Sequence, residues 1–144
     1  MIKRVNMKKF GFIFVLLFFI SCEKKDEQID RKIPDGKYTG TFHREIVWSD
    51  NDTANITMTF SSDKWTGNSE KMYYPALCKG TYKIIGDTII FENECFWPAH
   101  FDWSLILGEK YAFKQTENVI EFSRDYRSAT TDTYIDIYRI TREK

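Results

Sequence analysis

Apolar and polar residues alternate along most of the chain after residue 34. The pattern is regular in Ile56–Phe60, Thr81–Ile84 and Ile135–Tyr138, where Thr, Tyr, Ile and Phe are abundant. A period of two residues is typical of half-buried antiparallel strands. Turn residues separate expected strands at 37–47, 53–61, 64–68, 78–85, 88–94, 101–107, 110–115, 118–124 and 132–141. We therefore predict an all-β domain, an antiparallel up-and-down barrel of about eight strands or, alternatively, a small β-sandwich.

The dipeptide Gly86-Asp87 sets the register of one hairpin in detail. Glycine at the first central position favours a two-residue type II′ turn. One face of this hairpin is apolar and ends in Cys78 opposite Cys95, while the other face pairs Lys79 with Glu94. The two cysteines form a non-hydrogen-bonded pair, with Cα atoms about 4.5 Å apart. We therefore predict a disulfide, which an exported protein can keep; two reduced core cysteines are the alternative.

The N-terminus has the pattern of an export signal. Met1–Lys9 is basic, and Phe10–Ile20 is an uncharged run of 11 residues. As a helix this run would be about 16 Å long, short of the ~30 Å hydrocarbon core of a bilayer. It therefore favours a signal peptide, at residues 1–21, over a membrane span.

The residues after this run, Phe19-Ile20-Ser21-Cys22, resemble a bacterial lipobox, with Phe19 in place of the usual Leu. The resemblance implies cleavage before Cys22 and a lipid on its sulfur, which would anchor the protein to the outer membrane of a cell envelope. Whether it faces the periplasm or the cell surface stays open. Eight of the ten residues 23–32 are charged, so we expect a flexible tether at 22–33 and the β-barrel domain at 34–144.

The net charge argues against nucleic acid as a partner. The formal charge of the whole chain is zero, but the signal peptide carries four of the 21 basic residues and none of the 21 acidic ones. The mature chain therefore has 17 basic and 21 acidic residues, a net charge of −4. A mildly acidic domain does not attract phosphate backbones.

The polar residues give no pattern typical of catalysis. The two histidines, His43 and His100, stand in no spaced cluster, so we predict no metal site and no cofactor. Ser104 has no evident base beside it, and Glu92 and Glu94 fall on the solvent face of a strand. We therefore expect no catalytic residues and a protein that is not an enzyme.

Aromatic residues crowd the stretch from 96 to 103, where Trp97, Phe101 and Trp103 are the candidate ligand-lining residues. Aromatic residues at strand ends are often core packing, which is the first interpretation. The second is the lining of a site for a small hydrophobic or glycan ligand.

The whole domain resembles the lipocalin-like small lipoproteins of Bacteroidota. The resemblance is carried by Gly36–Phe42, Cys78–Tyr82 and Tyr134–Tyr138. It departs from true lipocalins at Tyr38, which stands where their first strand has Trp, so no ligand site is carried over residue by residue.

Three functions are consistent with the sequence: a binding module for a small hydrophobic or glycan ligand, a protein-interaction module acting as an inhibitor or accessory subunit in the envelope, and an enzyme with an unrecognised site. A wide cavity lined by aromatic residues favours the first, and a filled core with an apolar outer patch favours the second. A buried, paired histidine in a cleft favours the third.

Overall fold

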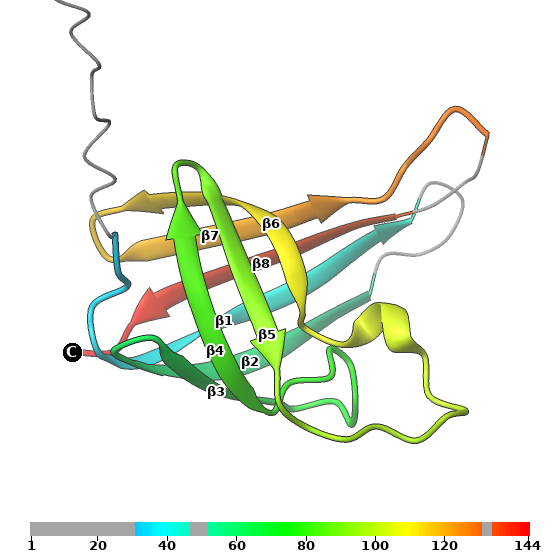
Figure 1. Ribbon diagram of the computed structural model, residues 1–144, viewed down its shortest axis with the longest axis horizontal. Coiled ribbons are helices and arrows are strands. Elements are labelled where there is room, and N and C mark those ends of the chain that lie inside the picture. The colour runs from blue at the N-terminus through cyan, green and yellow to red at the C-terminus, as the bar shows by residue number, and fades with distance from the viewer. Residues whose placement is uncertain (1–30, 47–51, 131–133) are drawn as a thin grey trace, which may run out of the picture.

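The computed structural model describes residues 31–46, 52–130 and 134–144, which form one closed antiparallel barrel (Figure 1). Each strand pairs with the next, and the last returns to the first. The predicted eight-stranded up-and-down barrel is therefore confirmed. The expected signal peptide and Cys22 lie outside the described residues. The strands are β1 (Gly36–Ile46), β2 (Asp52–Ser61), β3 (Lys64–Ser69), β4 (Lys79–Ile85), β5 (Thr88–Asn93), β6 (Glu109–Thr116), β7 (Val119–Asp125) and β8 (Tyr134–Arg142).

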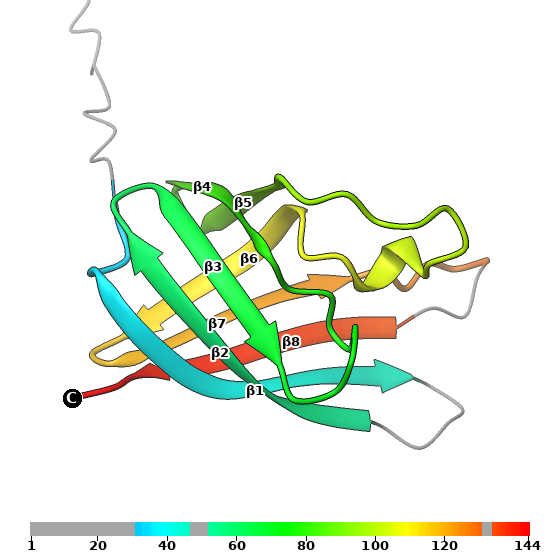
Figure 2. The same cartoon turned by 90° about the horizontal axis from the view of Figure 1, so that it is seen from below.

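The two ends of the barrel differ in their connections. Two-residue turns join β2 to β3, β4 to β5 and β6 to β7 at one end, where both ends of the described chain also lie (Figures 1 and 2). We call this the tight-turn end. The longer connections, including residues 70–78 and 94–108, lie at the opposite end, the loop end.

The register predicted for the β4–β5 hairpin is confirmed. Ile85 pairs with Thr88, and the pairing continues outward to Gly80 and Asn93. Gly86 has a φ of +58°, the positive value that the first central position of a type II′ turn requires.

The disulfide prediction also agrees with the structure, although its local geometry was wrong. Cys78 and Cys95 lie at disulfide-bonding distance, but their Cα atoms are 6.4 Å apart, not about 4.5 Å. The paired strands end at Lys79 and Asn93, so both cysteines lie just beyond the ladder. The chains diverge there, and the disulfide spans the wider gap.

The strand predicted at 101–107 was wrong. Residues Trp103–Leu105 form a short 3₁₀ turn, η1, inside a loop. Asp102 caps this turn, because its carboxylate accepts hydrogen bonds from the Ser104 amide at 3.0 Å and from the Ser104 hydroxyl at 2.6 Å. This local capping outweighs the alternating apolar pattern.

Aromatic side chains fill the inside of the barrel. The rings contact one another both between adjacent strands and across the barrel. Phe122 of β7 stacks on Tyr138 of β8 with ring centroids 4.6 Å apart, and it lies 5.0 Å from the ring of Phe91 on β5. Two inward glycines let neighbouring strands approach closely, because a Cβ at Gly40 or Gly80 would lie within 2.0 Å of a carbonyl oxygen on the neighbouring strand. The largest fully buried side chains are those of Trp65, Tyr38, Tyr111, Tyr138, Phe42, Phe60, Phe91, Phe113 and Phe122.

The chain closes the tight-turn end as it enters the barrel. Ile33, which the sequence placed in the tether, is only 1% exposed and belongs to the core. Its amide donates to the hydroxyl of Tyr82 at 3.1 Å, and the hydroxyl of Tyr38 donates to the Pro34 carbonyl at 2.7 Å. Tight packing therefore begins at Ile33, one residue before the expected domain boundary.

Candidate functional site

The aromatic residues predicted as ligand-lining gather at the loop end of the barrel. All three lie in residues 94–108, the segment between β5 and β6 that we call the aromatic loop (Figure 1). Trp97 and Trp103 line one cleft of about 340 Å³. Phe101 does not line it; its ring stacks on Trp97 with centroids 5.2 Å apart and also meets Tyr73.

The cleft combines aromatic and polar groups. Trp103 is 60% exposed, so its ring is available to a ligand. Arg124 and Tyr126 come from β7 and the residue just after it, while Glu109 begins β6. We call this site the aromatic cleft. Its lining residues are Asn93, Cys95, Trp97, Trp103, Ser104, Ile106, Gly108, Glu109, Arg124 and Tyr126.

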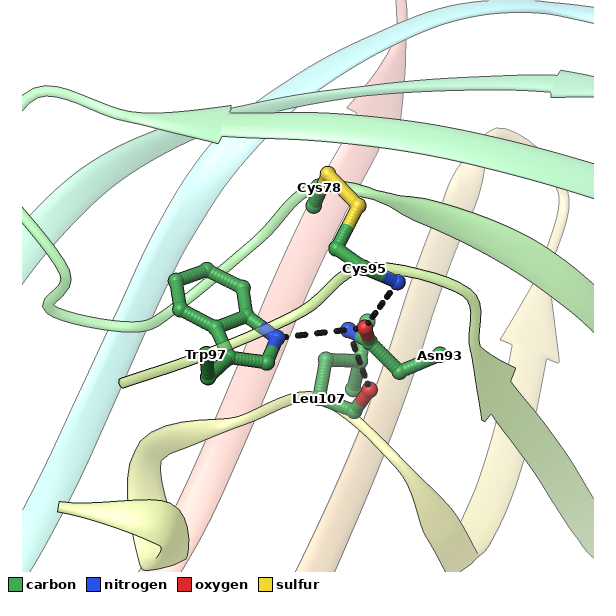
Figure 3. Close-up of a disulfide and its surroundings, with 5 residues drawn as sticks. All are labelled: Cys78, Asn93, Cys95, Trp97 and Leu107. Carbon is green, nitrogen blue, oxygen red and sulfur yellow. Dashed lines mark hydrogen bonds between the residues drawn. A yellow bond between two sulfur atoms is a disulfide. The ribbon is translucent and has the colours of Figure 1, made fainter. Parts of the chain in front are cut away.

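Asn93 fixes the start of the aromatic loop (Figure 3). Its side-chain oxygen accepts hydrogen bonds from the Cys95 amide at 2.9 Å and from the Trp97 indole at 3.2 Å. Its amide nitrogen donates to the carbonyl of Leu107 at 3.4 Å, near the other end of the loop. One side chain thus orients a cleft tryptophan and joins the two ends of the loop.

Two further attachments hold the loop to the segment before β4. The disulfide ties Cys95 to Cys78, which immediately precedes β4 (Figure 3). The amide of Ala76 donates to the Leu105 carbonyl at 2.9 Å, and the amide of Leu107 donates to the Ala76 carbonyl at 3.3 Å. The loop is therefore fastened at several points along its length.

A buried arginine holds the loop from inside the barrel. Arg44 on β1 pairs directly with Asp136 on β8, and the two residues are only 6% and 1% exposed. Two hydrogen bonds of 2.7 and 2.8 Å join the guanidinium to the carboxylate. The same guanidinium donates to the hydroxyl and the carbonyl of Ser104 at 3.0 and 2.9 Å and lies over the ring of Tyr134.

Burial shapes the electrostatics of this pair. It raises the pKa of Asp136, while the hydrogen bonds and positive charge of Arg44 act in the opposite direction. Burial also disfavours the charged form of Arg44, which by itself would lower the pKa of that side chain. The hydrogen bonds and charge of Asp136 act in the opposite direction, and the pKa of Arg44 is raised overall. A buried ion pair with so large a desolvation cost is weak evidence for stability. Its clearest structural effect is to position Ser104.

The sequence reasoning missed Arg44 and Asp136, although a signal for them exists. Arg44 lies two residues after Phe42, and Asp136 lies two residues before Tyr138, so each continues an inward-facing row. Opposite charges at inward positions of the first and last strands, which must pair to close a barrel, point to a buried ion pair.

The cleft wall carries a second arginine. The guanidinium carbon of Arg124 lies 4.3 Å from the centre of the Tyr126 ring. The Nη2 atom of Arg124 lies 2.5 Å from Oε2 of Glu109, whose side chain is 72% exposed. The cleft can therefore offer aromatic faces, a guanidinium and a carboxylate to one ligand.

The histidines and Ser104 have other roles. His43 is hydrogen-bonded to the Thr53 hydroxyl at 3.0 Å on the barrel surface, and His100 is exposed. Within residues 31–46, 52–130 and 134–144, no three His, Cys, Asp or Glu side chains gather as a metal site. Ser104 is used by the cap of η1 and by Arg44.

Comparisons with known proteins give no identification. No protein-family model, curated protein or solved structure matches this chain. Among the residues that the structure describes, there is no helix of sufficient length and apolar character to cross a bilayer.

Proposed function

We propose that this protein is a non-catalytic envelope module, anchored by a lipid on Cys22, that binds a glycan in the aromatic cleft. The observation that carries the proposal is that Trp97 and Trp103 line one cleft together with a guanidinium and a carboxylate. Buried aromatic rings fill the inside of the barrel, so the aromatic cleft is the better candidate for a ligand site.

The lining fits a sugar better than a hydrocarbon chain. An apolar ligand would remove water from Arg124 and Glu109 without replacing their hydrogen bonds, which is costly. A sugar ring offers hydroxyl groups to these side chains and apolar C–H faces to Trp97 and Trp103. Sites of this kind combine aromatic walls with a few placed polar groups.

The attachments of the aromatic loop support a binding role. A loop held by Asn93, by the Cys78–Cys95 disulfide and by Arg44 is ordered before any ligand arrives. A preorganised loop loses little conformational entropy on binding, which favours affinity.

The position of the cleft also suits an anchored protein. Arg31, the first described residue, lines a hollow with Ser62 and Asp63 of the β2–β3 turn, and so lies at the tight-turn end, opposite the aromatic loop. A lipid on Cys22, nine residues earlier, would hold the tight-turn end toward the membrane. The cleft would then face away from it.

The proposal can be tested with the full chain in detergent on an array of neutral and acidic oligosaccharides, followed by calorimetric titration of the sugars that bind. We expect Trp103→Ala to weaken binding about tenfold or more, equivalent to about 1.4 kcal/mol. Phe96→Ala is the matched control, because Phe96 is fully exposed in the same loop and does not line the cleft. Equal losses in the two variants, or the absence of any bound sugar, would contradict the proposal.

A second candidate function is a protein-interaction module. Phe96, Met72 and Tyr73 are 103%, 84% and 51% exposed and lie near the same end of the barrel. Apolar side chains exposed together are typical of contact surfaces. For this function, Phe96→Ser and Met72→Ser would prevent complex formation in cross-linked host envelopes and leave sugar affinity unchanged. The candidate fails if neither change alters the cross-linked complexes.

A further inference from the structure

We propose that the aromatic cleft is selective for sugars that carry a carboxylate, which binds Arg124 in place of Glu109. This inference rests on the proposed function and names the ligand class of the same site. It is carried by the arrangement of Arg124, Glu109 and Asp136.

The carboxylate that faces Arg124 inside the barrel, that of Asp136, is already paired with another arginine. Arg44, Asp136 and Arg124 are paired across the adjacent strands β1, β8 and β7, so their side chains emerge on the same face. Both carboxylate oxygens of Asp136 are used by Arg44, at 2.7 and 2.8 Å. The row is therefore one buried ion pair with a second arginine beside it.

Glu109 is the carboxylate that occupies Arg124, and it is suited to displacement. Its side chain is 72% exposed, against 29% for that of Arg124. Exposed ion pairs contribute little free energy, so a better-placed carboxylate can replace this one at small cost. The contact between the two side chains joins Nη2 of Arg124 to Oε2 of Glu109 at 2.5 Å. A ligand carboxylate could engage two guanidinium nitrogens, which is the stronger geometry.

A cationic ligand fits the cleft less well. Aromatic walls with a nearby carboxylate can bind a quaternary ammonium group. Here the guanidinium of Arg124 already lies over Tyr126 and against Glu109. A ligand cation would meet like charge at this position, whereas an anion would meet a charge of the opposite sign.

The charges balance when a ligand exchanges with Glu109. The incoming carboxylate takes the place of the Glu109 carboxylate on Arg124, and Glu109 turns into water at the rim of the cleft. The sugar ring attached to the ligand carboxylate would then lie beside Trp103, which lines the same cleft.

The experiment is a calorimetric titration of the full chain in detergent with matched pairs of sugars. Oligogalacturonate is compared with its methyl ester, oligoglucuronate with its methyl ester, and sialyllactose with lactose. We expect at least one acidic sugar to bind tenfold or more tightly than its neutral counterpart. Arg124→Gln should abolish that preference, so that the acidic sugar binds no more tightly than its neutral counterpart.

Glu109→Gln should strengthen binding of the acidic sugar severalfold, because it removes the competing carboxylate. Arg139→Gln and Glu117→Gln are the matched controls, since they make the same charge changes at exposed positions that do not line the cleft. Both should leave the preference intact. Circular dichroism and thermal melting verify that every variant folds. Because the Glu109 side chain is exposed, Glu109→Gln tests the inference even if Arg124→Gln does not fold.

The outcomes separate the inference from the proposed function. Binding of neutral and acidic sugars with equal affinity, lost in Trp103→Ala, would refute the carboxylate inference and leave the proposed function standing. Equal effects of Arg124→Gln and Arg139→Gln would also refute the inference, as would tighter binding of choline than of any acidic sugar. If no sugar binds at all, both the inference and the proposed function fail.

Discussion

The buried pair of Arg44 and Asp136 gives the most demanding test of the structure. Replacing Asp136 by Asn keeps the shape of the side chain but removes the buried counter-charge of Arg44, leaving only the exposed carboxylate of Asp102, 3.9 Å from Nη1 of Arg44. Loss of one partner of a buried ion pair costs about 3–5 kcal/mol. A domain of this size has a total stability of about 5–15 kcal/mol, so the loss is a large fraction of it.

The assay is denaturation of the full chain in guanidinium chloride or urea, followed by tryptophan fluorescence. Asp125→Asn is the matched control, because Asp125 forms the same kind of pair with Arg127 at 2.7 Å, but both side chains are about half exposed. We expect only a small loss in this control, since exposed pairs contribute little. Equal losses for Asp136→Asn and Asp125→Asn would refute the reasoning.

The double variant Arg44→Met, Asp136→Leu separates the effect of the ion pair on protein stability from its effect on the position of the aromatic loop. Replacing both charges by apolar groups removes the desolvation cost, so we expect most of the lost stability to return. The anchors on Ser104 are lost at the same time. Hydrogen exchange of the aromatic loop should therefore remain faster than in the unaltered protein, even where the denaturation midpoint has recovered.

Three further predictions follow from other parts of the barrel. Reducing the Cys78–Cys95 disulfide, or replacing both cysteines by Ser, should lower the free energy of unfolding by about 3 kcal/mol, measured by denaturation with and without reductant. Gly80→Ala should unfold the protein at a much lower temperature than Gly108→Ala, because a Cβ at Gly80 would lie 1.7 Å from a backbone oxygen and one at Gly108 meets open space. Burial raises the pKa of Tyr74 to about 12, so its neutral form is favoured in the fold. The stability that this contributes is complete below pH 10 and lost as the pH rises through 12, measured by denaturation midpoints and tyrosinate absorbance.

The sequence was sufficient for the strands whose turns and alternation agree. In the β4–β5 hairpin, Gly86 determines the turn and the turn determines the register, so local information reaches as far as Asn93. Beyond that residue the side chain of Asn93 bonds the Cys95 amide and the chain leaves the sheet. A prediction from the two-residue period assumes that both strands continue in register, so the predicted distance between the Cα atoms of the two cysteines was too short.

The candidate site was only partly predictable for a similar reason. The crowding of Trp97 and Trp103 is visible in the sequence, and both residues line the cleft. Their partners Glu109 and Arg124 come from β6 and β7, and the pairing of these two strands places them beside the aromatic loop, which no spacing in the loop itself indicates. In β8 the alternation alone fits either face, and the signal for Asp136 emerges only when β8 is matched with Arg44 on β1.

Closure of the sheet also governs how copies of this chain can meet. β1 and β8 pair along nine residues, so neither presents a row of unused backbone N–H and C=O groups. Sheet edges of that kind are the templates from which β-augmentation and amyloid growth begin. Copies of this chain that meet at the β1–β8 seam would therefore contact one another through side chains alone, and this seam carries little danger of strand-to-strand fusion.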